Sequence, residues 1–342
     1  MELVNPLDHP AWDAWVGKFP EAQFFHGSGW GRVLRETYGH RPVYPAVLKG
    51  DKLEGVLPLM EVASPLTGRR GVSLPFTDFC APLRGAGVEG REFFEAAMAE
   101  GRRAGWRYLE CRGGQEDWGG SSACVSYWGH SIDLTGGAPQ LFEGLDGAIR
   151  RGVRKAEKSG LKVEFGVDSG LMDVYYGLHG ETRRRHGLPP QPLLLFKNIQ
   201  RGMLAAGFGE VGLVRREGRA IAGAVYLWFG RRAIYKYGAS DYKEQEHRPN
   251  NLLMWRAMER LAGRGFERLH LGRTSLMHEG LRRFKLGFGA EENMIESCKY
   301  DFGRGAFVKE TDNVEGWHNE IFGRMPLFVL KLVGKLLYPH LS

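Results

Sequence analysis

The stretch EVGLVRREGRAIAGAVYLWFG, residues 210–230, decides the fold of the second half of this chain. Two apolar runs flank Glu217-Gly218, which is a turn signal, so the stretch predicts a β-hairpin. The strand pattern RRAIYKYGASD (231–241) follows it directly. Apolar residues at helical spacing in 250–265 and the apolar run FERLHLGR (266–273) then predict a helix and a buried strand. The order is strand, strand, strand, helix, strand.

The first half of the chain repeats this order. YPAVLKGDKLEGVLPLME (44–61) predicts a hairpin, GRRGVSLPF (68–76) a strand, EGREFFEAAMAEGRRAG (89–105) a helix and WRYLECRG (106–113) a buried strand. Repetition of a whole supersecondary unit indicates two similar α/β domains of the α+β type, each a mixed twisted sheet flanked by helices. We therefore expect residues 44–113 and 210–273 to share one strand order.

The predicted domains are 1–145 and 146–304, and a C-terminal helical segment, 305–342, is expected to pack back on the first domain. A chain of 342 residues is long enough for two hydrophobic cores.

Composition favours an intracellular protein with an anionic partner. The chain carries a formal charge of +7 and has a sequence pI near 9.2, a mild basic excess. Its four cysteines show no spacing typical of zinc ligands or of a disulfide framework, and the N-terminus lacks a secretory signal pattern. The most apolar segment, MPLFVLKLVGKLLY (325–338), is shorter than a bilayer span and contains Lys331 and Lys335. We expect a cytoplasmic protein, either free or peripheral to the inner face of the membrane.

A basic helix is predicted at 145–160, LDGAIRRGVRKAEKSG. Its apolar face comprises Leu145, Ile149, Val153 and Ala156, and its basic face comprises Arg150, Arg151, Arg154, Lys155 and Lys158. Two interpretations remain open. The basic face is a solvated surface, or it contacts the phosphates of a tRNA or nucleotide substrate.

The order of elements in each half resembles the GNAT acyltransferase core, and the whole chain resembles the FemAB family of peptidyltransferases, whose members hold two such cores. The segments that carry this resemblance are SGWGRVLRETYGHRP (28–42), SLPFTDFCAPL (73–83), ETRRRHGLPPQP (181–192), YGASD (237–241), RPNNLLMW (248–255), LGRTS (271–275) and GLRRFKLGFG (280–289).

The resemblance implies that an aminoacyl group moves from a charged tRNA to an amine of a peptidoglycan precursor, without a bound cofactor or a metal. It also implies that the lysine of the FK motif, Lys285, lies near the activated ester of the donor. A fixed cation there lowers the barrier by stabilising negative charge on the carbonyl oxygen. From local composition alone, Lys285 is either a snorkelling surface lysine or a charge held where backbone and ligand come close. If it stabilises charge on the donor carbonyl, Lys285→Met should keep the aliphatic packing against Phe284 and Phe288, so stability should change little while activity falls.

Further substrate-binding candidates follow from the resemblance and from position. The loop at 181–192 is implied to face the cleft, and YGASD and LGRTS end two predicted neighbouring strands, where ligands commonly bind and where Asp241 and Arg273 alternatively pair with each other. Glu110 either pairs structurally with Arg112 or acts as a base for the incoming amine. The candidates are Arg185, His186, Tyr237, Asp241, Arg273, Thr274, Glu110, Arg154 and Lys158.

Two alternative functions remain. An acetyl-coenzyme A-dependent N-acyltransferase needs a glycine-containing turn for the pyrophosphate, and the corresponding junction, SDYKEQEHRPNN, has no glycine pair. A catalytically silent module of the same family would bind RNA or an envelope lipid through its basic face. The run WGRVLRETYG offers Arg32 and Arg35 where the family has an acceptor-binding lysine, so the acceptor is open.

Overall fold

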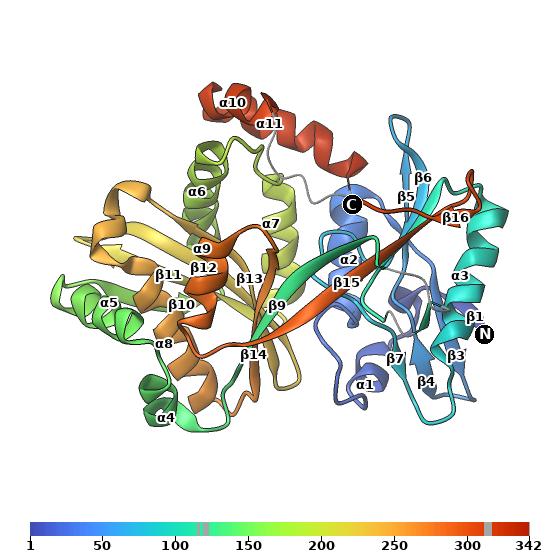
Figure 1. Ribbon diagram of the computed structural model, residues 1–342, viewed down its shortest axis with the longest axis horizontal. Coiled ribbons are helices and arrows are strands. Elements are labelled where there is room, and N and C mark those ends of the chain that lie inside the picture. The colour runs from blue at the N-terminus through green and yellow to red at the C-terminus, as the bar shows by residue number, and fades with distance from the viewer. Residues whose placement is uncertain (115–116, 119–122, 311–316, 342) are drawn as a thin grey trace. The chain divides into compact units, whose positions relative to one another are not determined.

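A computed structural model describes residues 1–114, 117–118, 123–310 and 317–341, for the last range without the side chains of residues 317 and 318 (Figure 1). The chain divides into two compact units. Unit 1 comprises Met1–Trp128, Met294–Asn313 and Leu336–Ser342, and unit 2 comprises Gly129–Asn293 and Val314–Lys335.

Unit 1 contains a 4-stranded sheet in the order β1-β3-β4-β7 and a second run of strands in the order β15-β8-β6-β5-β2. Its elements are β1 (Glu2–Val4), α1 (Trp12–Val16), α2 (Ser28–Tyr38), β2 (Arg41–Pro42), β3 (Tyr44–Leu48), β4 (Leu53–Val56), β5 (Met60–Ser64), β6 (Gly68–Val72), β7 (Leu83–Arg84), α3 (Gly90–Ala104), β8 (Tyr108–Arg112) and β16 (Ala306–Phe307).

Unit 2 contains strands in the order β10-β11-β12-β13-β14-β9. Its elements are α4 (Gly137–Glu143), α5 (Gly147–Lys158), β10 (Lys162–Gly166), α6 (Ser169–Arg185), α7 (Leu193–Ile199), β11 (Gly209–Arg216), β12 (Arg219–Phe229), β13 (Arg232–Ser240), α8 (Pro249–Gly263), β14 (Arg268–Ser275), α9 (Glu279–Leu286), α10 (Trp317–Arg324) and α11 (Leu327–Leu337).

Two long strands, β9 (Val125–Asp133) and β15 (Glu291–Asp301), each have residues in both units. β9 follows β8 in the chain, yet it is the neighbour of β14, and its residues from Gly129 onward belong to unit 2. β15 follows β14, yet its residues Ser297 to Asp301 pair antiparallel with β8 in unit 1. Each half of the chain therefore supplies a strand to the other half's sheet.

The predicted repeat of strand order is confirmed. In unit 2, β11, β12 and β13 form an antiparallel meander, and β14 returns parallel to β13 after α8. In unit 1, β5 and β6 are antiparallel, and β8 returns parallel to β6 after α3. The first-half hairpin pairs β3 with β4, and its return strand is divided at Pro58 into β4, in the 4-stranded sheet, and β5, beside β6, because proline cannot donate a ladder hydrogen bond.

The observed units differ from the predicted domains 1–145, 146–304 and 305–342. The prediction divided the chain into consecutive pieces, whereas each observed unit contains more than one segment of the chain. Residues of β15 after Asn293 belong to unit 1, and helices α10 and α11 up to Lys335 belong to unit 2. Within unit 2, Leu327 of α11 approaches Gly180 of α6. The part of the C-terminal segment that belongs to unit 1 is Leu336–Ser342, where the side chain of Ser64 lies 3.0 Å from His340 Nδ1. Residues 311–316 and 342 of the segment lie outside the described residues.

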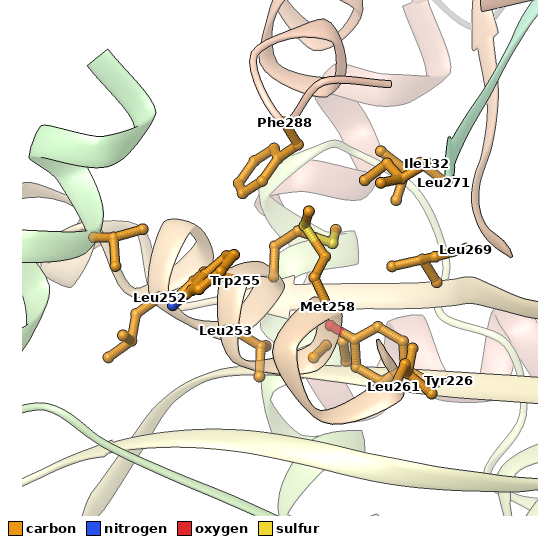
Figure 2. Packing of buried hydrophobic residues seen from close by; sticks show 14 of the residues in the cluster. Ile132, Tyr226, Leu252, Leu253, Trp255, Met258, Leu261, Leu269, Leu271 and Phe288 are labelled. Atoms are coloured by element: carbon orange, nitrogen blue, oxygen red, sulfur yellow. The ribbon is translucent and has the colours of Figure 1, made fainter. Parts of the chain in front are cut away.

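The two faces of β12 pack against different helices of unit 2. Ala222, Ala224 and Tyr226 belong to the cluster that α8 covers, where Met258 and Trp255 are buried (Figure 2). The residue between two of them, Gly223, lies against Tyr175 of α6. Since successive side chains of a strand point to opposite faces, α8 and α6 cover opposite faces of this sheet.

Replacing a helix glycine by alanine is predicted to lower the free energy of unfolding where the site is tightly packed and to raise it where the site is open. A Cβ at Gly101 of α3 would lie 2.2 Å from the ring of Phe302, whereas at Gly177 of α6 it would meet nothing within 4 Å. Gly101→Ala should lower the free energy of unfolding by about 1–3 kcal/mol. Gly177→Ala should raise it by about 0.5–1 kcal/mol through helix propensity. Denaturant unfolding of both variants is the measurement, and two changes of the same sign would contradict this packing.

Buried His179 predicts loss of stability in mild acid. Burial lowers the pKa of His179 from its ordinary value of 6.5 to about 3, and its Nε2 lies 2.7 Å from Gln191 Oε1. Because the unfolded chain binds this proton first, the contribution of His179 is complete above pH 6.5 and is lost as pH falls toward 3. His179→Gln should flatten the slope of unfolding free energy between pH 6 and pH 4 by about 1.4 kcal/mol per pH unit. An unchanged slope would show that His179 is protonated in the folded state.

Candidate functional site

The candidate site begins where two parallel strands of unit 2 diverge. β13 and β14 pair at Arg232 with Arg268, Ala233 with Leu269 and Ile234 with His270. β13 continues to Ser240 and β14 to Ser275 beyond the last of these pairs. The backbone groups past the divergence are thus released from mutual pairing and are available to other partners.

A β-bulge lies at the point of divergence. Tyr235 is opposite Tyr226 and Tyr237 is opposite Val225, so Lys236 is an extra residue in β13. A bulge bends its strand and is frequent beside active sites. Tyr237, a predicted site residue, lies just past the bulge, half-buried, with its ring packed 5.3 Å from that of Phe196.

Lys285 binds the diverging end of β14. Its side chain is 6% exposed, and Nζ donates to the carbonyl oxygens of Gly272 at 2.9 Å and Arg273 at 3.1 Å. Successive carbonyls of a regular strand point to opposite edges, and Gly272 has a φ of +72°, which lets both carbonyls reach one ammonium. The stretch 280–289 therefore consists of helix α9, which ends at Leu286, and a glycine-containing turn, and the last helical turn holds a buried charge against backbone.

A buried polar network that sequence reasoning missed lies beside Lys285. His130 of β9 is fully buried, with Nε2 3.0 Å from Glu292 Oε1 and Nδ1 3.5 Å from the hydroxyl of Thr274. Arg282 of α9 donates to both oxygens of Glu292, at 2.8 and 2.7 Å. The network joins β9, β14, α9 and β15 around the predicted residue Thr274.

The charges of this network keep His130 neutral. Desolvation lowers the pKa of His130, and the positive charge of Lys285 lowers it further, against an opposing effect of Glu292. Hydrogen bonds from Arg282 lower the pKa of Glu292. His130 Nε2 lies within ion-pair distance of the Glu292 carboxylate but without the angle of a hydrogen bond, and Nδ1 lies beside the Thr274 hydroxyl. His130 is therefore packed between Glu292 and Thr274.

A cavity of about 570 Å³ in unit 2 contains two predicted residues, Arg185 and Asp241. Arg185 donates from Nη1 to the carbonyl oxygen of Ser240 at 3.1 Å, and its guanidinium lies 5.3 Å from the ring of Tyr242. The charged lining residues are Arg184, Arg185, Arg219, Lys243, Glu181 and Asp241, a cationic excess that suits an anionic group.

Asp241 has a structural partner other than the one expected. Its carboxylate pairs with Arg219 at 2.8 Å and also caps the 3₁₀ helix Tyr242–His247 by accepting from the backbone N–H of Lys243. Hydrogen bonding from Arg219 lowers the pKa of Asp241. The alternative pairing of Asp241 with Arg273 is therefore replaced by the pair with Arg219. Arg273 itself has an exposed side chain and gives its carbonyl to Lys285.

His186 lies at the C-terminus of α6, exposed, with Nε2 3.3 Å from Arg185 Nη2. Desolvation lowers the pKa of His186, and the positive groups Arg185, Arg183 and His278 lower it further. The influence of His278 shows that the end of α6 lies near the start of α9, which carries Lys285.

The basic helix forms as predicted, as α5. Ile149, Val153 and Ala156 are buried, while Arg154 and Lys158 are exposed. Asp146 caps the helix by accepting from the backbone N–H of Ala148. The apolar face packs into the core that α8 covers. Both interpretations of the basic face require this exposure, so the choice between them stays a prediction.

Glu110 has the structural partner that one of its interpretations predicted. Arg112 Nε donates to Glu110 Oε1 at 2.8 Å, and Arg112 is 3% exposed, with further bonds to the carbonyls of Leu74 and Thr77. This pair belongs to unit 1, whereas the other predicted site residues belong to unit 2.

Comparison with known proteins defines the class of unit 2. Residues 147–293 match the family model described as an acetyltransferase (GNAT) domain. This segment of unit 2 is therefore similar to GNAT-type acetyltransferase domains, and within it β13, α8 and β14 supply the diverging strands and the helix between them. No curated protein matches the chain significantly in sequence.

Solved structures extend the likeness to nearly the whole chain. The structure of FemX has a TM-score of 0.66 at 15% identity, covering 88% of this chain and 97% of that one. The C-terminal domain of a putative lysylphosphatidylglycerol synthetase from Agrobacterium fabrum has a TM-score of 0.59 at 14% identity, with 88% and 94% covered. A tandem GNAT protein of the clavulanic acid biosynthesis pathway has a TM-score of 0.53 at 12% identity, with 90% and 94% covered. The predicted fold, two tandem GNAT-like domains, is confirmed.

Within the described ranges, no group of three or more His, Cys, Asp or Glu side chains is arranged to hold a metal ion. No helix in those ranges has the length and apolarity needed to cross a bilayer.

Burial of Lys285 changes the expected effect of its substitution on stability. The expectation that Lys285→Met would change stability little considered only the packing of the aliphatic stem, and it no longer holds because the ammonium itself is buried and bonded. Methionine leaves the carbonyls of Gly272 and Arg273 without their hydrogen-bond donor. Each buried group left unsatisfied should lower the free energy of unfolding by about 1–3 kcal/mol. The matched control is Lys155→Met on the exposed face of α5, which should cost about 0.5 kcal/mol or less. Equal thermal midpoints for the two variants would show that the buried bonds contribute nothing.

Proposed function

We propose that this protein transfers an acyl group, an aminoacyl group from aminoacyl-tRNA, to an amine of a cell-envelope component such as a peptidoglycan precursor. The GNAT-type domain supports acyl transfer as the class of reaction. The resemblance to the FemAB family motivates the aminoacyl donor and the envelope acceptor. We place the protein on the cytoplasmic side, at the inner face of the membrane.

The observation that carries the choice of donor is the connection from β13 to α8. A coenzyme A pyrophosphate needs free N–H groups and positive charge at this point. Here the connection is the 3₁₀ helix Tyr242–His247, and Glu244 within it pairs with Arg216 and Arg219. Two cations beside this connection, Arg216 and Arg219, are already paired with the carboxylates of Glu244 and Asp241, so protein groups occupy positive charge that a pyrophosphate would need. This arrangement disfavours a pyrophosphate and so favours a donor held elsewhere.

In the proposed reaction, the acceptor nitrogen forms a bond to the ester carbonyl carbon of the donor, and the ribose oxygen leaves with a proton. Negative charge develops on the carbonyl oxygen in the transition state. Lys285 fixes the end of β14 and supplies a positive potential there, since its ammonium also shifts the pKa of His130. Thr274, which lies beside His130, offers a hydroxyl at the same strand end.

The remaining predicted residues receive roles by position. Arg185, together with His186 and Asp241, forms or borders the cationic cavity, which suits a phosphate or carboxylate of the acceptor. Tyr237 lies past the bulge of β13, and Arg273 next to Thr274, where both would border the reacting groups. Arg154 and Lys158 of α5 would contact the phosphates of the tRNA.

The family description as an acetyltransferase favours one alternative, an acetyl-coenzyme A-dependent N-acyltransferase. Titration with acetyl-coenzyme A and with aminoacyl-tRNA, each followed by a transfer assay on a uridine-diphosphate-linked peptide acceptor, separates the candidates. Tight coenzyme A binding with acetyl transfer would replace our proposal. Binding of tRNA without turnover would favour the catalytically silent module.

Charge reversal on α5 tests the tRNA-binding face. Arg154→Glu with Lys158→Glu should fold normally, because both side chains are exposed, and should weaken binding of tRNA. The plot of log affinity against log salt concentration should also become less steep, by about two units of slope, because two phosphate contacts are lost. Arg91→Glu with Arg102→Glu on α3 carries the same change of charge at another exposed helix and is the control. Equal losses in both variants would leave α5 as an ordinary solvated face.

A further inference from the structure

Helix α11 exposes a line of large apolar side chains. Phe328, Leu332 and Leu336 are 76%, 56% and 62% exposed, although each is an apolar residue that normally favours burial. They are spaced four residues apart, so they lie on one side of a single helix. The stripe they form, here called the outer stripe, runs about 12 Å along the helix at 1.5 Å per residue.

The helix is held so that the outer stripe cannot turn inward. On its inner side, Leu330 is fully buried, and a Cβ at Gly334 would lie 2.0 Å from the carbonyl oxygen of Pro190. The ammonium of Lys331 lies 4.9 Å from the ring of Tyr176 in α6. Backbone contact at Gly334 therefore fixes the rotation of α11 about its axis. Exposure of the stripe is a property of the docked helix.

Positive charge accompanies the outer stripe. Lys335 is exposed next to Leu336, and Arg324 is exposed at the end of α10, the preceding helix. From Leu327 to Leu337, the sequence LFVLKLVGKLL contains two lysines and no acidic residue. Apolar side chains on one face with basic residues beside them are the pattern of a helix that lies in the interface of an anionic membrane.

We propose that α11 adsorbs to an anionic lipid bilayer with Phe328, Leu332 and Leu336 inserted among the acyl chains and Lys335 at the phosphate level. Charge complementarity selects this partner over a second copy of the chain, because two such helices face to face would bring their lysines together. The inference rests on the proposed function for the identity of the membrane, whereas adsorption itself is independent of catalysis.

Adsorption would place the cationic cavity beside the lipid headgroups. Gly323 of α10 lines that cavity together with Arg184, Arg185 and Arg219. The helix pair that contacts the bilayer thus borders the proposed acceptor cavity within unit 2. An acceptor anchored in the membrane could then reach the cavity while its lipid part stays in the bilayer.

Vesicle flotation of the full-length protein tests the proposal. Vesicles of phosphatidylcholine with phosphatidylglycerol should bind the protein, and vesicles of phosphatidylcholine alone should bind it more weakly. Phe328→Ser with Leu332→Ser should reduce binding on the order of tenfold or more, because both side chains leave the acyl region. Lys335→Glu should reduce it about fivefold or more on anionic vesicles only.

The matched control is Leu66→Ser with Leu194→Ser, which removes two other exposed leucines, 71% and 49% exposed. Control binding should equal that of the parent. The proposal is overturned if the parent does not float with anionic vesicles, or if both double variants lose binding equally. It is also overturned if Phe328→Ser with Leu332→Ser instead abolishes a concentration-dependent dimer seen by sedimentation. Transfer to a soluble acceptor amine should be unchanged in that variant, so a failure of adsorption is distinguishable from a failure of the proposed function.

Discussion

Each half of this chain depends on the other half for a strand of its sheet. β8 in unit 1 pairs with β15, which follows β14 of the second half, and β14 in unit 2 neighbours β9, which follows β8 of the first half. A central strand left without its neighbour would expose a row of unpaired backbone groups. The exchange also contributes to the site, because the first half's strand β9 brings His130 to Glu292 of unit 2. Fold and candidate chemistry therefore rest on one arrangement.

Local patterns were sufficient to predict the repeated units. The turn at Glu217-Gly218, the alternation in β12 and the helical spacing in α8 are all encoded within short windows, and each lies where predicted. The exchanged strands were missed, because VSYWGHSID and EENMIESCKYD lack clear alternation and their partners are distant in sequence. For the same reason the predicted domain boundaries differ from the observed units.

The candidate site was predictable only in part. Lys285 and Thr274 were named through a family resemblance, and the structure places them at the same strand end. Nothing in the local sequence indicated that Lys285 would be buried, since its two acceptors are backbone carbonyls shaped by the positive φ of Gly272. His130 and Glu292 carried no motif, and they meet only because two exchanged strands bring them together. A local pattern of residue types does not show which side chains will be buried or which distant strands will pair.

The strand exchange has a consequence for how the protein is made. The ribosome releases β8 long before β15, so the edge of β8 that β15 covers stays open while the whole second half is being synthesised. At about 5–20 residues per second, that interval lasts on the order of ten seconds or more. During it, the nascent first half carries an exposed strand edge, the kind of surface that pairs with other chains and that chaperones recognise. Efficient production of this protein should therefore depend on translation rate and on chaperone supply more than its final stability suggests.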